Sequence, residues 1–176
     1  QVVSSGVASV SAGGNHSLFV KTDGSLWSMG TGWSGALGTG SDDDNATPSQ
    51  VVASSVTLAS AGGNHSLFVK TDGSLWAMGA NITGQLGDGN MTDRNIPVQV
   101  VPSGVASVSA GGNHSLFMKT DGSLWSMGTG WAGALGTGSD DDNATPTQVI
   151  ALNVALAAAG GNHSLFVKTD GSLWGM

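Results

Sequence analysis

The chain has 176 residues, a mass of 17.4 kDa and a formal net charge of -7, with 12 aspartates, no glutamate and only five Lys and Arg residues. This charge disfavours nucleic acid and anionic membranes as partners, because both require clustered Lys and Arg. Hydrophobic residues make up 39% of the chain, which is too many for a disordered chain despite its 29 glycines, and no apolar run is long enough to span a bilayer.

One stretch of sixteen residues dominates the sequence. AGGNHSLFVKTDGSLW, at 12–27, returns almost unchanged at 61–76, 110–125 and 159–174, so the copies are 49 residues apart. A fixed period of this size is typical of solenoids, propellers and other repeat arrays. The absence of cysteine excludes disulfides and fits either side of a membrane.

The first half of each unit predicts three short strands. Residues 7–12 alternate with period two, and the glycines and asparagine at 13–15 then favour a turn. Residues 16–22 form the second expected strand. Asp23-Gly24 suits a type I′ hairpin, which leads into a third strand at 25–29.

The second half of the unit is looser. Residues 30–48 are rich in glycine and contain one buried-looking pair, Ala36-Leu37, so we expect a long excursion. A short fourth strand follows at 49–52. Four short antiparallel strands in 49 residues is the content of a propeller blade, and no window shows a competing helical periodicity. The sequence therefore predicts an all-β propeller built from four-stranded antiparallel blades.

The second unit carries a family resemblance. AGGNHSLFVKTDGSLWAMGANITGQLGDG at 61–89, followed by Pro-Val-Gln-Val at 97–100, resembles the repeat of the regulator of chromosome condensation family in its bacterial form. The resemblance covers essentially the whole chain and implies a β-propeller, which in that family usually has seven blades. The first and third units differ: each has Ala-Leu-Gly in place of Gln-Leu-Gly and adds a tryptophan, Trp33 and Trp131.

The period also fixes the expected organisation. Whole blades are predicted at 7–55, 56–104 and 105–153, and the remainder, 154–176, holds only three strands. Because Gln1-Val2-Val3 matches the fourth strand of the other units, 154–176 plus 1–6 is expected to form one blade shared between the termini. Such sharing leaves no open sheet edge.

Three arrangements follow from a shared blade. The chain could close as a lone ring of four blades, two chains could exchange ends into an eight-bladed ring about a two-fold axis, or the chain could belong to a longer array. The near-identity of the first and third units indicates duplication in pairs and favours an even number of blades. We favour a homo-oligomer or a longer array over the lone ring.

One histidine recurs in every unit directly after the Gly-Gly-Asn turn. A ring of metal-binding or catalytic histidines is one interpretation, and a hydrogen bond that holds the blade together is the other. The structural interpretation is preferred, because residues repeated in every blade normally hold repeats together. These residues are His16, His65, His114 and His163.

Two acidic clusters in the excursions are the candidate metal site. Carboxylate and amide oxygens are the ligands that Ca²⁺ prefers, although the spacing fits no EF-hand and consecutive aspartates in a loop are commonly just solvated. Calcium is therefore the one cofactor considered, and otherwise none is expected. The candidate ligands are Asp42, Asp43, Asp44 and Asn45, and Asp140, Asp141, Asp142 and Asn143.

Trp33, Trp131 and Arg94 are the candidate partner-binding residues of the loops. A tryptophan on a loop can anchor a partner protein or stack on a sugar, or it can cover the end of its own blade. By contrast, the tryptophan at the end of each sixteen-residue stretch, such as Trp27, is expected to pack between blades.

No nucleophile with a base, no phosphate-binding loop and no cysteine metal site is present, so no enzyme is predicted. We expect a non-enzymatic module for protein binding or self-assembly, extracellular or at a bacterial cell surface. A calcium-assisted lectin is the alternative from another class. The resemblance also implies an exchange-factor-type regulator of a small GTPase, since the family includes such factors, but a basic surface for chromatin is absent.

Overall fold

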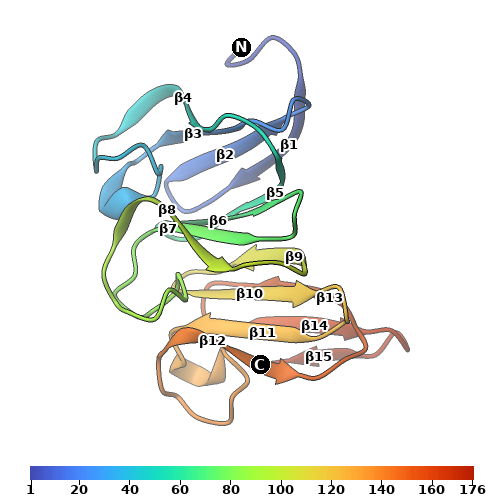
Figure 1. Ribbon diagram of the computed structural model, residues 1–176. Coiled ribbons are helices and arrows are strands. Elements are labelled where there is room, and N and C mark those ends of the chain that lie inside the picture. Colours follow the sequence, from blue (N-terminus) through green and yellow to red (C-terminus); the bar gives the residue numbers. More distant parts are fainter.

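The computed structural model describes residues 1–176, and its regular secondary structure is almost entirely β-strand (Figure 1). No helix is long and apolar enough to cross a membrane. The strands are β1 (Val7–Ala12), β2 (His16–Lys21), β3 (Leu26–Gly30), β4 (Asn45–Val52), β5 (Val56–Ala61), β6 (His65–Lys70), β7 (Leu75–Gly79), β8 (Arg94–Val101), β9 (Val105–Ala110), β10 (His114–Lys119), β11 (Leu124–Gly128), β12 (Asn143–Ile150), β13 (Val154–Ala159), β14 (Ser164–Lys168) and β15 (Leu173–Gly175), with two short 3-10 helices, η1 (Trp33–Gly35) and η2 (Trp131–Gly133).

The strands form four separate antiparallel sheets, one for each repeat unit. Three are four-stranded, in the orders β1-β2-β3-β4, β5-β6-β7-β8 and β9-β10-β11-β12, and the last, β13-β14-β15, has three strands. Each sheet is a simple meander, in which strands consecutive in the sequence pair as antiparallel neighbours. The predicted all-β class with four-stranded antiparallel blades is confirmed.

The predicted hairpin forms in every unit, but its turn type differs from the prediction. The N–H of Gly24 donates to the carbonyl of Lys21 at 2.9 Å, and Gly24 has φ +79° while Asp23 is not among the residues with positive φ. A type I′ turn needs positive φ at both central residues. The observed turn places only the glycine in the left-handed region, where it is unstrained, and leaves Asp23 free to cap the turn.

The fourth strand is longer than predicted. β4 begins at Asn45 and pairs Gly30 with Asn45 and Ser28 with Ser49, so it includes Pro48. Proline is compatible with this position because β4 is the edge strand and its outward N–H needs no partner within the sheet. The excursion is therefore shorter than expected and ends at residue 44.

The hydrophobic core lies between blades rather than within one blade. The Leu and Val side chains of one blade pack against the Phe and Met side chains of the next, as Leu18, Val20 and Leu26 do against Phe68 and Met78. Equivalent clusters join the second blade to the third and the third to the fourth. Neighbouring blades are therefore held by burial of apolar surface, the main favourable contribution to folding.

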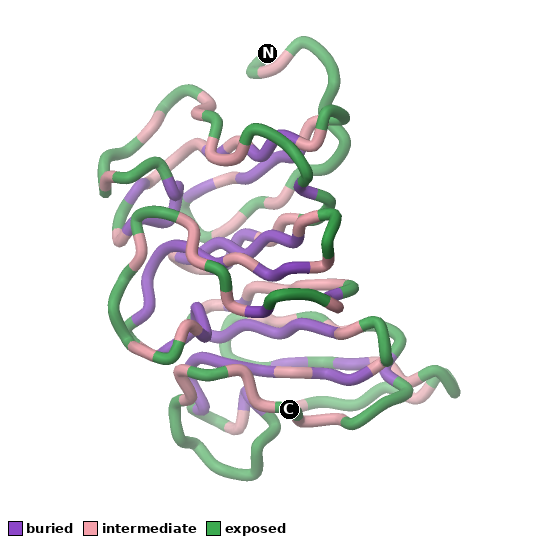
Figure 2. Tube along the Cα trace, viewed as in Figure 1, coloured by how far each residue is buried: buried purple, intermediate pink, exposed green.

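The four blades follow one another as an open arc. Figure 1 shows the first and fourth blades at opposite ends, and contacts between sheets run from β2 to β5, from β6 to β9 and from β10 to β13. Residues 1–6 form no strand and are mostly exposed (Figure 2). The three-stranded last sheet has no fourth strand beside β15. The blade shared between the termini stays a prediction.

Candidate partner-binding face

Three loops leave the same side of the first three blades, at residues 31–44, 80–93 and 129–142; we refer to them as the blade loops (Figure 1). Each is closed by the same hydrogen bond, from a backbone N–H at the start of the loop to an aspartate at its end. The bonds are Gly32 N to Asp44 Oδ1 at 2.9 Å, Asn81 N to Asp93 Oδ1 at 2.7 Å and Gly130 N to Asp142 Oδ1 at 3.0 Å.

Two of these loops present a tryptophan to solvent. Trp33 begins η1 with 60% of its surface exposed, and Trp131 begins η2 with 62% exposed. The next residue, Ser34 or Ala132, has φ 57°. A non-glycine residue in the left-handed region costs about 1 kcal/mol and is kept only where its surroundings fix it. Each tryptophan therefore projects from a turn of defined shape.

The tryptophan at the end of the sixteen-residue stretch is held in a different way. Trp27 stacks on Phe19 with ring centroids 6.1 Å apart, donates from Nε1 to Ser25 Oγ at 2.9 Å, and lies 4.6 Å from the Lys21 ammonium. The same set recurs in all four blades. This repeated tryptophan is structural, which leaves the loop tryptophans as the candidates for binding.

The second blade loop places an aliphatic side chain at the same position. Ile82 lies 49 residues after Trp33 and 49 before Trp131, and 69% of its surface is exposed. The tryptophans are thus substitutions at a shared position rather than additions to the unit. Sequence reasoning missed Ile82, although the period alone could have identified it. We refer to Trp33, Ile82 and Trp131 as the apolar row.

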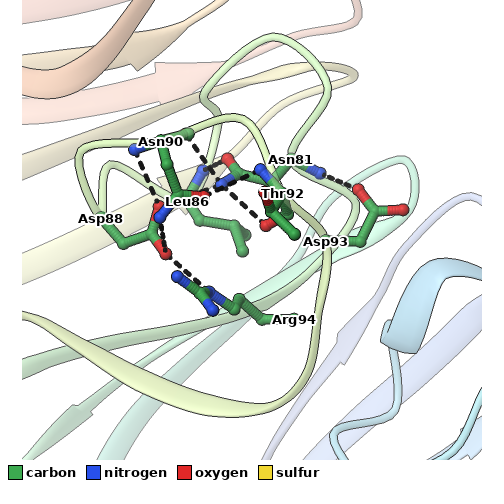
Figure 3. A network of polar contacts seen from close by, with 7 residues as sticks. All are labelled: Asn81, Leu86, Asp88, Asn90, Thr92, Asp93 and Arg94. Atoms are coloured by element: carbon green, nitrogen blue, oxygen red, sulfur yellow. Dashed lines mark hydrogen bonds and ion pairs between the residues drawn. The ribbon is translucent and has the colours of Figure 1, made fainter.

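Arg94 is engaged within its own blade. Its Nε lies 2.7 Å from Asp88 Oδ2, and the Asp88 side chain is only 3% exposed while that of Arg94 is 37% exposed (Figure 3). The other Asp88 oxygen accepts from Asn81 Nδ2 at 3.0 Å. The ion pair therefore holds the second blade loop, and binding of a partner by Arg94 stays a prediction.

Asn81 is the centre of that loop. Its Nδ2 also donates to the carbonyls of Asn90 at 3.0 Å and Thr92 at 3.1 Å, while its Oδ1 accepts from the Leu86 N–H at 3.0 Å (Figure 3). The first and third blades have glycine at this position, Gly32 and Gly130. The second loop is thus closed by a buried amide that the tryptophan-bearing loops lack.

The aspartates of the acidic clusters are exposed, and some of them accept hydrogen bonds within their own loops. Asp44 and Asp142 accept the loop-closing hydrogen bonds, and Asp140 Oδ1 accepts from Gly133 N at 3.1 Å. Asn45 and Asn143 donate from Nδ2 to Ser49 and Thr147. No three His, Cys, Asp or Glu side chains gather into a set that fits a metal ion. Calcium binding by these residues stays an untested prediction.

The repeated histidines connect neighbouring blades. His16 Nε2 lies 2.8 Å from Ser66 Oγ, and that hydroxyl donates to the carbonyl of Ala36 at 2.8 Å. Because the hydroxyl proton is used for the carbonyl, Nε2 must carry the proton that bonds the hydroxyl. The same relay starts from His65 and from His114. His163, in the last blade, is exposed.

These contacts leave one ring nitrogen without a partner. The Nδ1 atoms of His65 and His114 are buried and accept no hydrogen bond. Burial lowers the pKa of His65 to about 3 and that of His114 to about 4, and it also lowers the pKa of His16. A neutral imidazole is therefore built into each interface between blades, which suits packing rather than proton transfer near neutral pH.

Comparison with known sequences identifies the repeat. A sequence model of the regulator of chromosome condensation repeat matches residues 23–69, 72–118 and 121–167, and a second model of that repeat matches 7–34 and 56–85. No curated protein matches the chain.

Comparison with solved structures gives the same fold. The chain is similar to human WBSCR16, with TM-score 0.84 and 23% identity over 96% of this chain and 46% of that one. It is also similar to Prp20p of Saccharomyces cerevisiae, described with its binding to Gsp1p and histones, with TM-score 0.82 and 23% identity over 96% and 44%. The yeast protein bound to Kap60 matches with TM-score 0.81, 23% identity and coverage of 96% and 43%.

The chain spans less than half the length of these structures, and at this identity the likeness establishes the β-propeller fold alone. The repeat models, in contrast, match most of its residues. The chain belongs to the regulator of chromosome condensation repeat family.

Proposed function

We propose that this chain is a non-enzymatic module that binds a protein through its blade loops, with the apolar row as the anchor. The observation that carries the proposal is the pair of exposed tryptophans, each held by a turn with a left-handed residue. Tryptophan is the side chain most enriched among binding hot spots, and a preformed position avoids the entropy cost of ordering it.

The negative charge of the loops indicates what kind of partner surface would fit them. Asp42, Asp43, Asp140 and Asp141 are exposed on the same loops as Trp33 and Trp131, and the chain has a net charge of -7. A partner that offers Lys or Arg beside an apolar pocket would complement this face, and opposite charges would speed their encounter. Solved members of the fold are described with protein partners, which supports binding of a protein here as well.

A location outside the cytoplasm of a bacterium is part of this proposal. It is supported by the likeness of the repeat to the bacterial form of the family, and the absence of cysteine is compatible with it. Fractionation of the source cells tests it directly, since the chain should be recovered in the secreted or surface fraction. Recovery in the cytoplasm would contradict it.

Affinity capture with three baits tests the binding face. The baits are the unchanged chain, a double variant with Trp33→Ala and Trp131→Ala, and Leu152→Ala, which truncates another exposed apolar residue outside the blade loops. The expected partner is retained by the first and third baits and lost from the second. With that partner purified, the double variant should raise Kd about a hundredfold or more, since a hot-spot tryptophan contributes about 2 kcal/mol or more.

The same three proteins separate the rival functions. A glycan array with calcium and with chelator tests the lectin, and release of a labelled guanine nucleotide from small GTPases tests the exchange regulator. A sugar bound through the tryptophans, or nucleotide release that the double variant abolishes, would replace the proposal. Equal retention of every protein by all three baits would remove the blade loops as the binding face.

A further inference from the structure

The first and third blade loops are two copies of one structure. Residues 31–44 and 129–142 have the same sequence except at one position, which is Ser34 in the first loop and Ala132 in the third. The same hydrogen bond closes both loops, both left-handed residues have φ 57°, and the two tryptophans are 60% and 62% exposed. The chain therefore displays the same candidate binding element twice.

In each copy the tryptophan lies beside exposed aspartates. A methyl added at Gly32, the residue before Trp33, would clash with the backbone carbonyl of Asp43, and Gly130 has the same relation to Asp141 in the third loop. The backbone of each acidic cluster thus passes directly beside the start of the tryptophan turn. Neither loop contains a Lys, Arg or His, and neither cluster takes part in an ion pair. The two elements therefore combine an exposed aromatic ring with unpaired negative charge.

The loop between them differs in both respects. Ile82 takes the place of the tryptophan, and Met91 and Thr92 stand where the other two loops have a pair of exposed aspartates. Ile82 is 69% exposed and Met91 is 50% exposed. The three loops therefore alternate along the row of blades, from acidic with tryptophan, through neutral with aliphatic side chains, to acidic with tryptophan again.

Contacts between loops and blades fix the spacing of the two tryptophans. The N–H of Gly40 in the first loop donates to the carbonyl of Asn95 on β8 at 2.8 Å, and Asn95 Nδ2 donates back to the Gly40 carbonyl at 3.1 Å. The second loop is joined to β12 by a bond from the Gly89 N–H to the carbonyl of Ala144 at 2.9 Å. Because buried apolar clusters also join these three blades, the blade loops form one rigid surface.

We infer, on the basis of the proposed function, that the partner carries two copies of one basic element, as a symmetric dimer or a tandem repeat, and that one partner particle binds both acidic loops at once. Each element places a Lys or Arg against a loop tryptophan and its neighbouring carboxylates. The chain itself makes such a contact, since the Lys21 ammonium lies 4.6 Å from the Trp27 ring. The partner surface between the two elements is apolar and covers Ile82.

Two features favour one particle over two separate partner molecules. The exposed aliphatic side chains of the second loop lie between the two tryptophan loops in the order of the blades, and two separate molecules would leave them in water. The rigid spacing also makes the second contact of one particle intramolecular. Such double attachment raises the overall affinity about a hundredfold or more above that of one element.

The probe is the protein that the unchanged chain retains from an extract of the source cells and that the double variant with Trp33→Ala and Trp131→Ala does not retain. Purified in its native state, it is titrated by calorimetry into the unchanged chain and into each single tryptophan variant. Ser34→Ala is the matched control, because it makes the first loop identical to the third. Ile82→Asp, at an exposed site, tests the contact between the two elements.

Each single tryptophan variant should raise Kd about a hundredfold, by a similar factor and without a change in stoichiometry, because loss of one element removes the gain from double attachment. Ile82→Asp should raise Kd about tenfold or more, since it buries a charge under an apolar surface. Ser34→Ala should leave Kd unchanged. The probe should be a dimer by light scattering, or its sequence should contain the basic element twice.

Several results would overturn this inference and leave the proposed function standing. Single variants with half the stoichiometry and an unchanged Kd would mean two independent partner molecules, and full affinity in one single variant would mean that only one loop binds. An unchanged Kd for Ile82→Asp, or a monomeric probe without an internal repeat, would also contradict it. If instead the double variant retains every protein that the unchanged chain retains, the proposed function fails and this inference fails with it.

Discussion

His65 Nε2 lies 2.9 Å from Ser115 Oγ in the next blade, and the same hydroxyl donates to the Gln85 carbonyl at 2.7 Å. A serine of the third blade thereby contacts two parts of the second blade, its histidine and its blade loop. The relay recurs between each pair of neighbouring blades. Because the apolar clusters are small, these buried polar contacts are expected to fix how neighbouring blades align.

Replacement of that serine should destabilise the protein. Ser115→Ala leaves the buried His65 Nε2–H and the Gln85 carbonyl without a partner, which costs about 1–3 kcal/mol for an unsatisfied buried group. Urea denaturation followed by fluorescence measures the change in the free energy of unfolding. Ser54→Ala, at an exposed site, is the control and should lie within about 0.5 kcal/mol of the unchanged protein. Equal stability of the two variants would contradict a structural role for the relay.

The buried histidines should make stability depend on pH. The pKa of His65 is lowered to about 3 and that of His114 to about 4, against 6.5 for an unperturbed histidine. As the pH falls below 6.5, the unfolded chain takes up protons that the folded chain does not. The contribution of these histidines to the free energy of unfolding is therefore complete above pH 6.5 and decreases toward pH 4. Each histidine contributes a slope of about 1.4 kcal/mol per pH unit.

Denaturation curves at pH 7, 6, 5 and 4 measure this slope. The aspartates of the hairpins do not interfere, since hydrogen bonds from Ser25 and its equivalents lower their pKa from 3.8, and their contribution is lost only at lower pH. His65→Gln should flatten the slope. A stability that stays constant from pH 7 to pH 4 would show that the histidines are not held neutral.

The second glycine of the repeated pair should not tolerate alanine where a blade follows. In Gly112→Ala the added methyl would meet the backbone oxygen of Gly161 at 2.4 Å, a contact that only separation of the blades can relieve. A loss of about 2 kcal/mol or more is expected by thermal denaturation. Gly161→Ala is the matched control: a methyl added there meets nothing within 4 Å, so its Tm should be nearly unchanged.

Asn81→Ala should loosen the second blade loop. The substitution removes the side-chain bonds to Asp88, Asn90, Thr92 and Leu86 and leaves several of those groups without partners. A loss of about 2–4 kcal/mol is expected, measured by urea denaturation, with faster hydrogen exchange across 81–93. Met91→Ala, at an exposed site of the same loop, serves as the control. A similar effect of both substitutions would argue against the network as the cause.

The strands and their order could be predicted from the sequence, because both depend on local patterns that recur every 49 residues. Two local details were wrong. The hairpin glycine alone takes positive φ, so the turn is not type I′, and β4 starts at Asn45 because an edge strand accepts Pro48. The exposure of Trp33 and the ion pair between Arg94 and Asp88 could not be predicted from the sequence, since both depend on how a loop folds against its own blade.

The sequence by itself determined the repeat, the antiparallel blades and the family, because hydrophobic alternation and glycine turns act over a few residues. Only the tertiary structure decided which side chains meet across blades, as His16 and Ser66 do from positions 50 residues apart. It also decided which surfaces remain open. Leu165 and Leu116 stand in nearly identical local sequences, yet one is exposed and the other buried, because burial depends on whether another blade packs against the face.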